Sequence, residues 1–299
     1  MQVMHFLWRG ILAIVTMGAL ALTAVYARTE YQIRRHVAVP RLTDFHVPRD
    51  SATLARGSHY VHAVNGCAGC HDGDLGGKVI LDDAKVMRLV SSNLTTGRGG
   101  VLSQYDDAAL ATAIRHGVAP DGRVLRFMPS HEFSGMADDH VAAIIAYIRS
   151  QPPVDHELPP ITVGPIARVL SVAGKMALFP YYRIDHNVRP LAQAPAGATE
   201  EHGRYLARSC IGCHGEGMSG GRIPGAPGSW PAAANLTPTG LGTWTEESFI
   251  RTMRTGVDPS GQQLREPMPW QSFGKMSDDE LRALWMYLAT LSRKPSGGR

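Results

Sequence analysis

Two hydrophobic patterns organise this chain, and the first is an uninterrupted apolar run near the N-terminus. Residues 10–27 include no charged side chain, and a run of this length can cross a bilayer as a helix. Trp8 and Tyr26 lie at its two ends, where interfacial aromatic residues are favoured. A cleaved signal peptide is the alternative, although the run exceeds a typical signal core of about 7 to 15 residues. We therefore expect a retained transmembrane helix within residues 1–30.

The second pattern is an amphipathic helix that occurs twice. Leu281, Leu284, Trp285 and Leu288 are spaced at i, i+3, i+4 and i+7 after a capping-box sequence at residues 277–280. Val141, Ile144, Ile145 and Ile148 repeat this stripe. Further helices are predicted from 52 to the cysteines near 67, over 106–116, from 199, and over 245–255, with left-handed caps at Gly117 and Gly256. No run alternates with period two, so we predict an all-α fold.

The two stripes belong to a repeat of about 140 residues. Asn93-Leu94-Thr95 recurs as Asn235-Leu236-Thr237, and Met128-Pro129 recurs as Met268-Pro269. The first copy has three extra residues between Gly57 and Cys67 relative to Gly203 and Cys210. The repeat predicts two tandem domains, over residues 46–153 and 198–294.

A proline-rich linker, residues 154–197, separates the two predicted domains. Within it, residues 166–178 can form one short apolar helix with Arg168 and Lys175 on its polar side. We expect this helix to pack against the domains, with contact to a membrane as the alternative.

Composition narrows the function. Of the 299 residues, 44% are hydrophobic and 19% are charged, as in a globular protein, and the formal net charge is +4. The basic residues are spread along the chain rather than clustered, so we expect no nucleic-acid partner.

All four cysteines lie in two copies of one pentapeptide, Cys-x-x-Cys-His, at residues 67–71 and 210–214. This is the attachment pattern of c-type haem, so Cys67, Cys70, Cys210 and Cys213 are predicted to bind two haem c groups covalently, with His71 and His214 as iron ligands. A zinc site or a thioredoxin-like redox pair is the alternative, and the adjacent histidine argues against both. Covalent haem attachment occurs outside the bacterial inner membrane, which predicts an N-terminus in the cytoplasm and haem domains in the periplasm.

Met128 and Met268 are the predicted sixth ligands of the two irons. A thioether ligand raises the reduction potential, and the proline after each methionine stiffens the loop. His131 competes in the first copy, but its repeat partner is Gln271; His116 likewise pairs with Thr255. Met136 and Met276 also recur and are interpreted as packing residues. His59, His62 and His140 are assigned no role.

Two more repeated pairs have structural interpretations. Tyr147 and Tyr287 are expected to pack against the first helix near Gly57 and Gly203. Asn93 and Asn235 either hydrogen-bond a haem propionate or stabilise a turn.

With these residues in place, the chain resembles the class I cytochrome c domains of cytochrome subunits in bacterial membrane-bound alcohol, aldehyde, sorbitol or gluconate dehydrogenases. The resemblance covers about two thirds of the chain, and it is carried by the haem motifs and by residues 235–238, 242–244, 254–256 and 268–270. Such subunits usually have three haem motifs rather than two. A proline carbonyl commonly orients their haem histidine, but the first copy has no proline between His71 and Pro120, whereas the second has Pro224, Pro227 and Pro231.

The resemblance implies an electron carrier rather than an enzyme. We predict a membrane-anchored, periplasmic dihaem cytochrome c that transfers electrons between a dehydrogenase or quinol-linked donor and a downstream cytochrome or terminal oxidase. Its expected partners are therefore the inner membrane and other redox proteins. The alternative is a dihaem enzyme of the peroxidase or thiosulfate dehydrogenase type, in which one haem is open.

Overall fold

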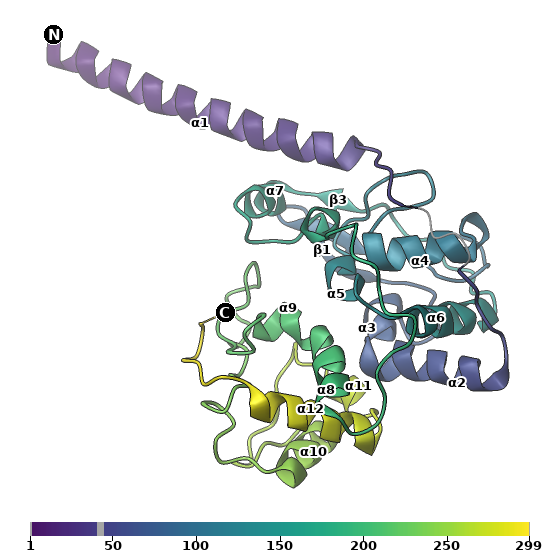
Figure 1. Ribbon diagram of the computed structural model, residues 1–299. Coiled ribbons are helices and arrows are strands. Elements are labelled where there is room, and N and C mark those ends of the chain that lie inside the picture. Colours follow the sequence, from purple (N-terminus) through teal and green to yellow (C-terminus); the bar gives the residue numbers. More distant parts are fainter. Residues whose placement is uncertain (1, 41–44, 299) are drawn as a thin grey trace.

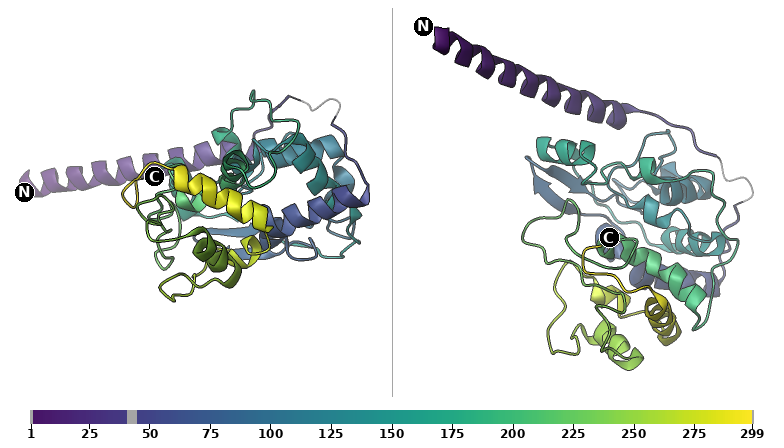
Figure 2. Two further views of the ribbon diagram at one scale, coloured as in Figure 1. Left: turned by 60° about the horizontal axis from the view of Figure 1, so that its bottom comes forward. Right: turned by 60° about the vertical axis from the view of Figure 1, so that its left-hand side comes forward.

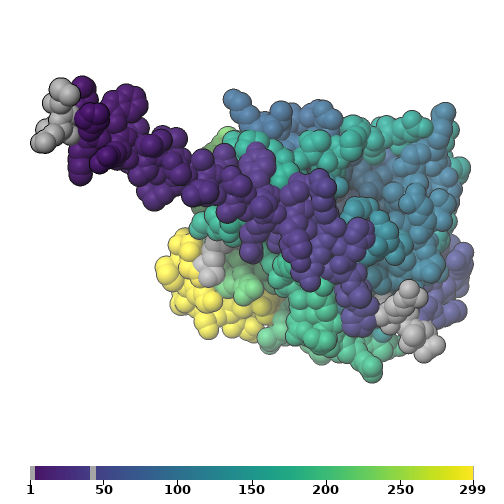
Figure 3. All heavy atoms as spheres, turned by 90° about the horizontal axis from the view of Figure 1, so that it is seen from above, coloured from purple at the N-terminus to yellow at the C-terminus, as the bar shows by residue number. Residues whose placement is uncertain are grey.

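The computed structural model describes residues 2–40 and 45–298 and is mostly helical. The N-terminal helix α1 (Gln2–Arg34) projects away from the rest of the molecule (Figure 1), and its apolar side chains are exposed. Residues Met4–Arg34 are long and apolar enough to cross a membrane, by length and composition. Seen from above, α1 passes over the first half of the molecule before it extends beyond it (Figure 3).

Apart from one helix in the linker, the remaining α-helices occur in two sets with the same order. The first set lies within the predicted range 46–153, called the first unit, and contains five α-helices: α2 (Ser51–His59), α3 (Cys67–His71), α4 (Asp107–His116), α5 (Ser130–Phe133) and α6 (Asp138–Ser150). The second unit, residues 198–294, contains α8 (Glu200–Leu206), α9 (Ile211–His214), α10 (Glu246–Thr255), α11 (Trp270–Phe273) and α12 (Asp278–Thr290). Short 3-10 turns lie at Leu102–Gln104, Pro180–Arg183 and Ala207–Cys210.

The predicted helix signals are confirmed. α12 begins after Ser277 with a complete capping box, in which Ser277 and Glu280 each bond the backbone N–H of the other. α4 and α10 end at Gly117 and Gly256, whose φ angles of 65° and 71° are left-handed. These local sequence signals therefore fix the ends of the helices that carry each unit.

A close contact between the first and last helices stabilises each unit. A Cβ atom on Gly57 of α2 would overlap the carbonyl oxygen of Ala143 and crowd Tyr147 on α6. Likewise, a Cβ atom on Gly203 of α8 would overlap the carbonyl oxygen of Ala283 and crowd Tyr287 on α12. The expected packing of both tyrosines near the glycines is thus confirmed.

The units differ just before the cysteine motif. The predicted first helix does not run unbroken from 52 to the motif, because α2 changes into a π-helical turn, Tyr60–Val64, which ends before Gly66. The second unit has the tighter 3-10 turn Ala207–Cys210 at this place. The wider turn accommodates the three extra residues of the first copy, and it buries Ala63 and Val64 in the hydrophobic cluster of the second unit.

The fold is mostly helical, as predicted, but it also contains three short strands that were not predicted. β1 (Val79–Asp83) pairs antiparallel with β2 (Met87–Val90), and β2 pairs antiparallel with β3 (Thr162–Val163) of the linker. Every residue of β1 is exposed, and the pairing shifts register between Val79 and Leu81. No alternating apolar pattern marked the strand, because neither of its faces is buried.

The linker packs mainly against the first unit and α1. Its helix α7 (Pro165–Val172) is shorter than the predicted 166–178, because the chain turns at Gly174 with φ of 70°. The buried residues of this region form a third cluster: Met87, Leu89, Val124, Ala167, Leu178 and Phe179. Figure 2 shows the β1–β2 hairpin and α7 at the same end of the molecule, close to α1.

Candidate haem sites

The first candidate site is built around α3, which carries the first Cys-x-x-Cys-His motif. Gly66 precedes this helix with φ of 62°, a conformation that glycine adopts without strain. Cys67 packs against the hydrophobic cluster of the first unit, and His71 ends the helix. Burial raises the pKa of the Cys67 thiol to about 12.

A backbone carbonyl orients the imidazole of His71. Its Nδ1 lies 2.8 Å from the carbonyl oxygen of Ser92. A carbonyl only accepts hydrogen bonds, so Nδ1 carries the ring hydrogen and Nε2 keeps its lone pair. Burial also lowers the pKa of His71, which favours the neutral ring. A neutral imidazole with its Nε2 available is what a haem iron requires of a protein ligand.

The second site repeats this arrangement on α9. Nδ1 of His214 lies 2.8 Å from the carbonyl oxygen of Ala234, and burial raises the pKa of the Cys210 thiol to about 12. Cys210 packs against the cluster of the second unit, so the two cysteine pairs occupy separate cores. The histidine orientation expected from a proline carbonyl is therefore supplied by serine in one unit and alanine in the other.

The carbonyls that orient the histidines are positioned by the next residue. Asn93, which follows Ser92, accepts hydrogen bonds from the N–H and hydroxyl of Thr95 and donates to the carbonyl of Val154 at 2.7 Å. Asn235, which follows Ala234, makes the same bonds within its turn and donates to Lys294 O at 2.8 Å. Both asparagines are buried. Their amides thus hold a turn beside the end of each unit, which favours the turn interpretation over a propionate contact.

Met128 and Met268 lie in equivalent loops before α5 and α11. Met128 packs against the same cluster as Cys67 and Leu94, and Met268 against the same cluster as Cys210 and Leu236. Each methionine carbonyl accepts a hydrogen bond from the N–H two residues later, at 2.8 and 2.9 Å. In both units the predicted sulfur ligand therefore shares a hydrophobic core with its haem motif.

The remaining histidines and methionines have other partners. His116 Nδ1 lies 3.0 Å from His186 Nδ1 in the linker, and His131 Nε2 lies 3.9 Å from Glu132 Oε1. Met136 and Met276 are 4% and 2% exposed, which confirms that they are packing residues.

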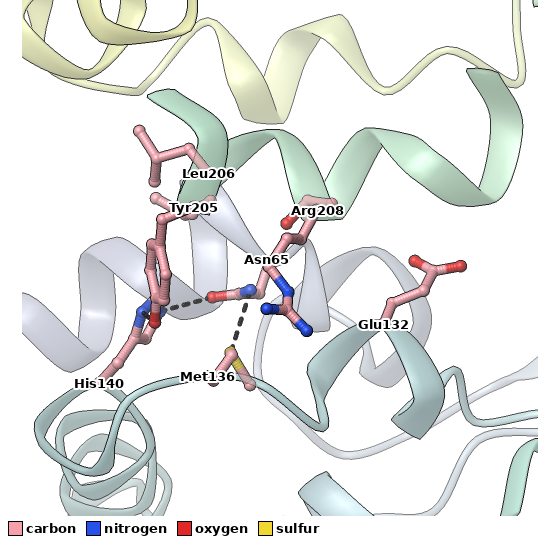
Figure 4. A pocket seen from close by; sticks show the side chains of 9 residues that line it. Asn65, Glu132, Met136, His140, Tyr205, Leu206 and Arg208 are labelled. Carbon is pink, nitrogen blue, oxygen red and sulfur yellow. Dashed lines mark hydrogen bonds between the residues drawn. The ribbon is translucent and has the colours of Figure 1, made fainter. Parts of the chain in front are cut away.

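His140, which received no role from sequence, is central to the contact between the units. Its ring stacks on Tyr60 with centroids 3.6 Å apart. Nδ1 accepts a hydrogen bond from the hydroxyl of Tyr205 at 2.6 Å, and Nε2 donates to Oδ1 of Asn65 at 2.8 Å (Figure 4). Burial lowers the pKa of His140 to about 3, so the ring is neutral. A neutral histidine thereby joins α6 of the first unit to α8 of the second.

A second part of this contact brings the two candidate sites together. Glu132 lies on α5, four residues after Met128, and a Cβ atom on Gly212 of the second motif would overlap its carboxylate. Burial raises the pKa of Glu132 to about 7. A Cβ atom on Gly135 would overlap the guanidinium of Arg208, and Figure 4 shows Arg208 between Asn65 and Glu132.

A hydrogen bond closes the edge of the same contact. His59 Nε2 on α2 lies 2.7 Å from Glu280 Oε2 on α12. Burial alone would raise the pKa of Glu280, but the hydrogen bonds from His59 and from Ser277 lower it overall. The one sequence feature that coincides with this contact is the three-residue insertion before the first motif.

Comparison with known proteins agrees with this geometry. Residues 201–292 match the cytochrome c family model. The second unit is therefore a cytochrome c domain. Such a domain implies covalently bound haem c, which the repeated histidine arrangement fits.

The chain is similar to several cytochrome subunits of dehydrogenases. The chain is 23% identical over 95% of its length to the fructose dehydrogenase cytochrome subunit of Gluconobacter japonicus, of which it covers 61%. About 30% of the chain is 33% identical to the gluconate 2-dehydrogenase cytochrome c subunit of Pantoea cypripedii, covering 22% of that protein. A similar share is 32% identical to the cytochrome c subunit of the quinone alcohol dehydrogenase of Gluconobacter oxydans, again covering 22%. The chain thus spans about three fifths or less of these relatives, and each of them is named as a cytochrome subunit of a dehydrogenase.

Proposed function

We propose that this protein is a membrane-anchored dihaem cytochrome c that carries electrons for a dehydrogenase. One haem c is attached through Cys67 and Cys70, the other through Cys210 and Cys213. The iron ligands are His71 with Met128 and His214 with Met268. The observation that supports this assignment most directly is the pair of equivalent hydrogen bonds, each 2.8 Å long, that place the ring hydrogen of His71 and His214 on Nδ1.

The bound haem iron would supply one-electron redox chemistry, and the surrounding residues set the conditions for it. Ser92 and Ala234 hold the imidazoles in one orientation through their carbonyls. Met128 and Met268 present a thioether, a ligand type that favours reduced iron. The hydrophobic clusters around each motif restrict water, which further adjusts the reduction potential.

The contact between the units supports electron transfer within the chain. Glu132 follows the loop of Met128 and reaches Gly212 between the second pair of cysteines. The hydrogen bonds of His140 to Tyr205 and Asn65 fix this contact. One haem site would then receive electrons from a donor while the other passes them to an acceptor.

The relatives support a dehydrogenase as the donor. We infer a downstream cytochrome or terminal oxidase as the acceptor. α1 supports attachment to the bacterial inner membrane, with both haem sites in the periplasm. The chemical step on the reduced substrate belongs to the partner, and this chain acts as the electron-transfer subunit.

Haem stoichiometry and ligation test the proposal on the full chain. A pyridine haemochrome assay should give two haem c per chain, and one in either the Cys67→Ser/Cys70→Ser or the Cys210→Ser/Cys213→Ser variant. The oxidised protein should show a weak band toward the red end of the spectrum from iron–sulfur ligation. One haem per native chain would contradict the dihaem assignment, and a high-spin signal from one haem would favour the enzyme with an open site.

A further inference from the structure

The linker helix α7 exposes an apolar face. Ala167 is fully buried in the third cluster, whereas Ile166, Val169 and Val172 are 44%, 46% and 40% exposed. These three residues follow one another at i, i+3 and i+6, so they lie on one side of the helix. A surface helix normally presents polar residues on its outer side. An apolar outer stripe instead indicates contact with an apolar surface.

α7 is fixed to the end of the candidate membrane span. Arg168 donates hydrogen bonds to the hydroxyl of Thr29 at 2.7 Å and to the carboxylate of Glu30 at 3.2 Å. Its guanidinium also lies over the ring of Tyr26, 4.7 Å from the centroid. Thr29 is fully buried by these contacts, so α7 and the end of α1 form one packed assembly.

The position of this contact along α1 gives the depth of α7. The charge-free run ends at residue 27, and an α-helix rises about 1.5 Å per residue, which places Thr29 and Glu30 within ~5 Å of the end of the run. The headgroup region on each side of a bilayer is roughly 5 to 8 Å thick. α7 therefore lies at headgroup depth when α1 spans the membrane.

The charges around α7 suit the same environment. Lys175 follows the helix and is exposed, and Arg28 is exposed on α1 next to Thr29. Basic residues beside an apolar face are typical of helices that lie in the surface of membranes with anionic lipids. Continuity with the span and this charge pattern both indicate a lipid surface as the occupant of the exposed stripe.

We propose that α7 is a second membrane contact, which lies in the bilayer surface with Ile166, Val169 and Val172 directed into the lipid. The inference rests on the membrane anchoring given under the proposed function. A single spanning helix fixes only the point where the chain leaves the bilayer. A second contact beside it also fixes how the first unit, and with it the site at His71, faces the membrane.

Photolabelling of the native full chain tests the proposal. The protein is reconstituted into vesicles of phosphatidylcholine and phosphatidylglycerol that contain a phosphatidylcholine with a diazirine in its acyl chain, and tryptic peptides are analysed by mass spectrometry. Peptide 10–28 reports on α1, peptide 169–175 on α7, and peptide 283–293 serves as the control, because it carries Met286 with a similar exposure of 40%.

We expect lipid adducts on peptides 10–28 and 169–175, several-fold above peptide 283–293. The double variant Val169→Asn/Val172→Asn should lose the adducts on peptide 169–175 and keep those on peptide 10–28. Labelling of 10–28 without 169–175 would overturn the inference while leaving the anchor intact, and would show that water or protein covers α7. Labelling of neither peptide would overturn both the anchor and the inference, and the haem assay would remain a separate test of the electron-transfer role.

Discussion

Both units orient the histidine of the haem motif through a backbone carbonyl. The chain between the histidine and that carbonyl has almost the same length in the two units but a different structure. The orienting carbonyl lies 21 residues after His71 in the first unit and 20 residues after His214 in the second. In the first, the intervening chain forms the β1–β2 hairpin; in the second, it contains three prolines and no strand in the described residues. The comparison shows that the position of the carbonyl at the end of this loop orients the histidine, whereas the path of the loop before that carbonyl can differ.

The first unit also makes more external contacts than the second. Its hairpin pairs with β3 of the linker, and its π-helical turn packs into the cluster of the second unit. Through the linker it reaches α1. The second unit, which matches the cytochrome c family model, lacks the hairpin and the insertion. The extra features of the first unit are therefore those that connect the parts of the molecule.

Loss of a sulfur ligand is expected to have the largest effect, and it tests whether the two haem sites are equivalent. Met128→Ala and Met268→Ala should each convert one haem to a high-spin state and lower its midpoint potential by on the order of 0.1 V, because a thioether favours reduced iron. Redox titration with electron paramagnetic resonance measures both changes.

The packing methionines provide the matched control for this experiment. Met136→Leu and Met276→Leu should keep both haems low-spin, since these side chains fill the cores. If either ligand variant stayed low-spin, the methionine of that unit would not bind iron, and the equivalence of the two sites would fail.

A smaller effect tests whether the helix contact is equivalent in the two units. Gly57→Ala and Gly203→Ala should each reduce the free energy of unfolding by about 3 kcal/mol, because the new Cβ atom would overlap a backbone carbonyl. Denaturant unfolding followed by circular dichroism measures the change. Gly73→Ala is the control, because its Cβ would meet no atom within 4 Å, and it should stay within about 0.5 kcal/mol of the native protein. Unequal losses would show that one unit tolerates the contact differently.

The most gradual effect concerns the boundary between the units, because it is spread over several pH units. His140 has a pKa of about 3 in the folded protein against 6.5 for a free histidine. Its neutral ring therefore stabilises the fold fully above pH 6.5, and this contribution is lost as pH falls from 6.5 toward 3, by up to about 1.4 kcal/mol per pH unit. The slope of stability against pH should become shallower in His140→Gln. His46→Gln, at an exposed position, serves as the matched control. An unchanged slope in His140→Gln would mean that this ring does not stay neutral at the contact.

Local signals explain which parts of the fold could be predicted from sequence. The capping box at Ser277, the apolar stripe of α12 and the glycine after α10 are local signals, so the start of α12 and both ends of α10 were predicted to within about one residue. The haem motifs are equally local. The strands were missed because the exposed residues of β1 show no alternation, and because β3 pairs from about 75 residues away.

The contact between the units could not be predicted for a similar reason. His140 and Tyr205 are 65 residues apart, and a histidine within an apolar helix does not by itself indicate a partner. Glu132 meets Gly212 only because the two units pack together. The types of the individual residues could not indicate this arrangement, since it depends on how the two hydrophobic clusters pack against each other.

The hydrogen bond from each haem-motif histidine to a main-chain oxygen has an evolutionary consequence. Every amino acid carries that oxygen, so exchanging the side chain at Ser92 or Ala234 leaves the acceptor in place. Selection can then change those side chains for other properties, such as solubility or partner recognition, without changing the orientation of the histidine imidazole. Such a site would not tolerate substitutions that tilt the peptide plane carrying this carbonyl. It would tolerate substitutions that change only the polarity of the side chain.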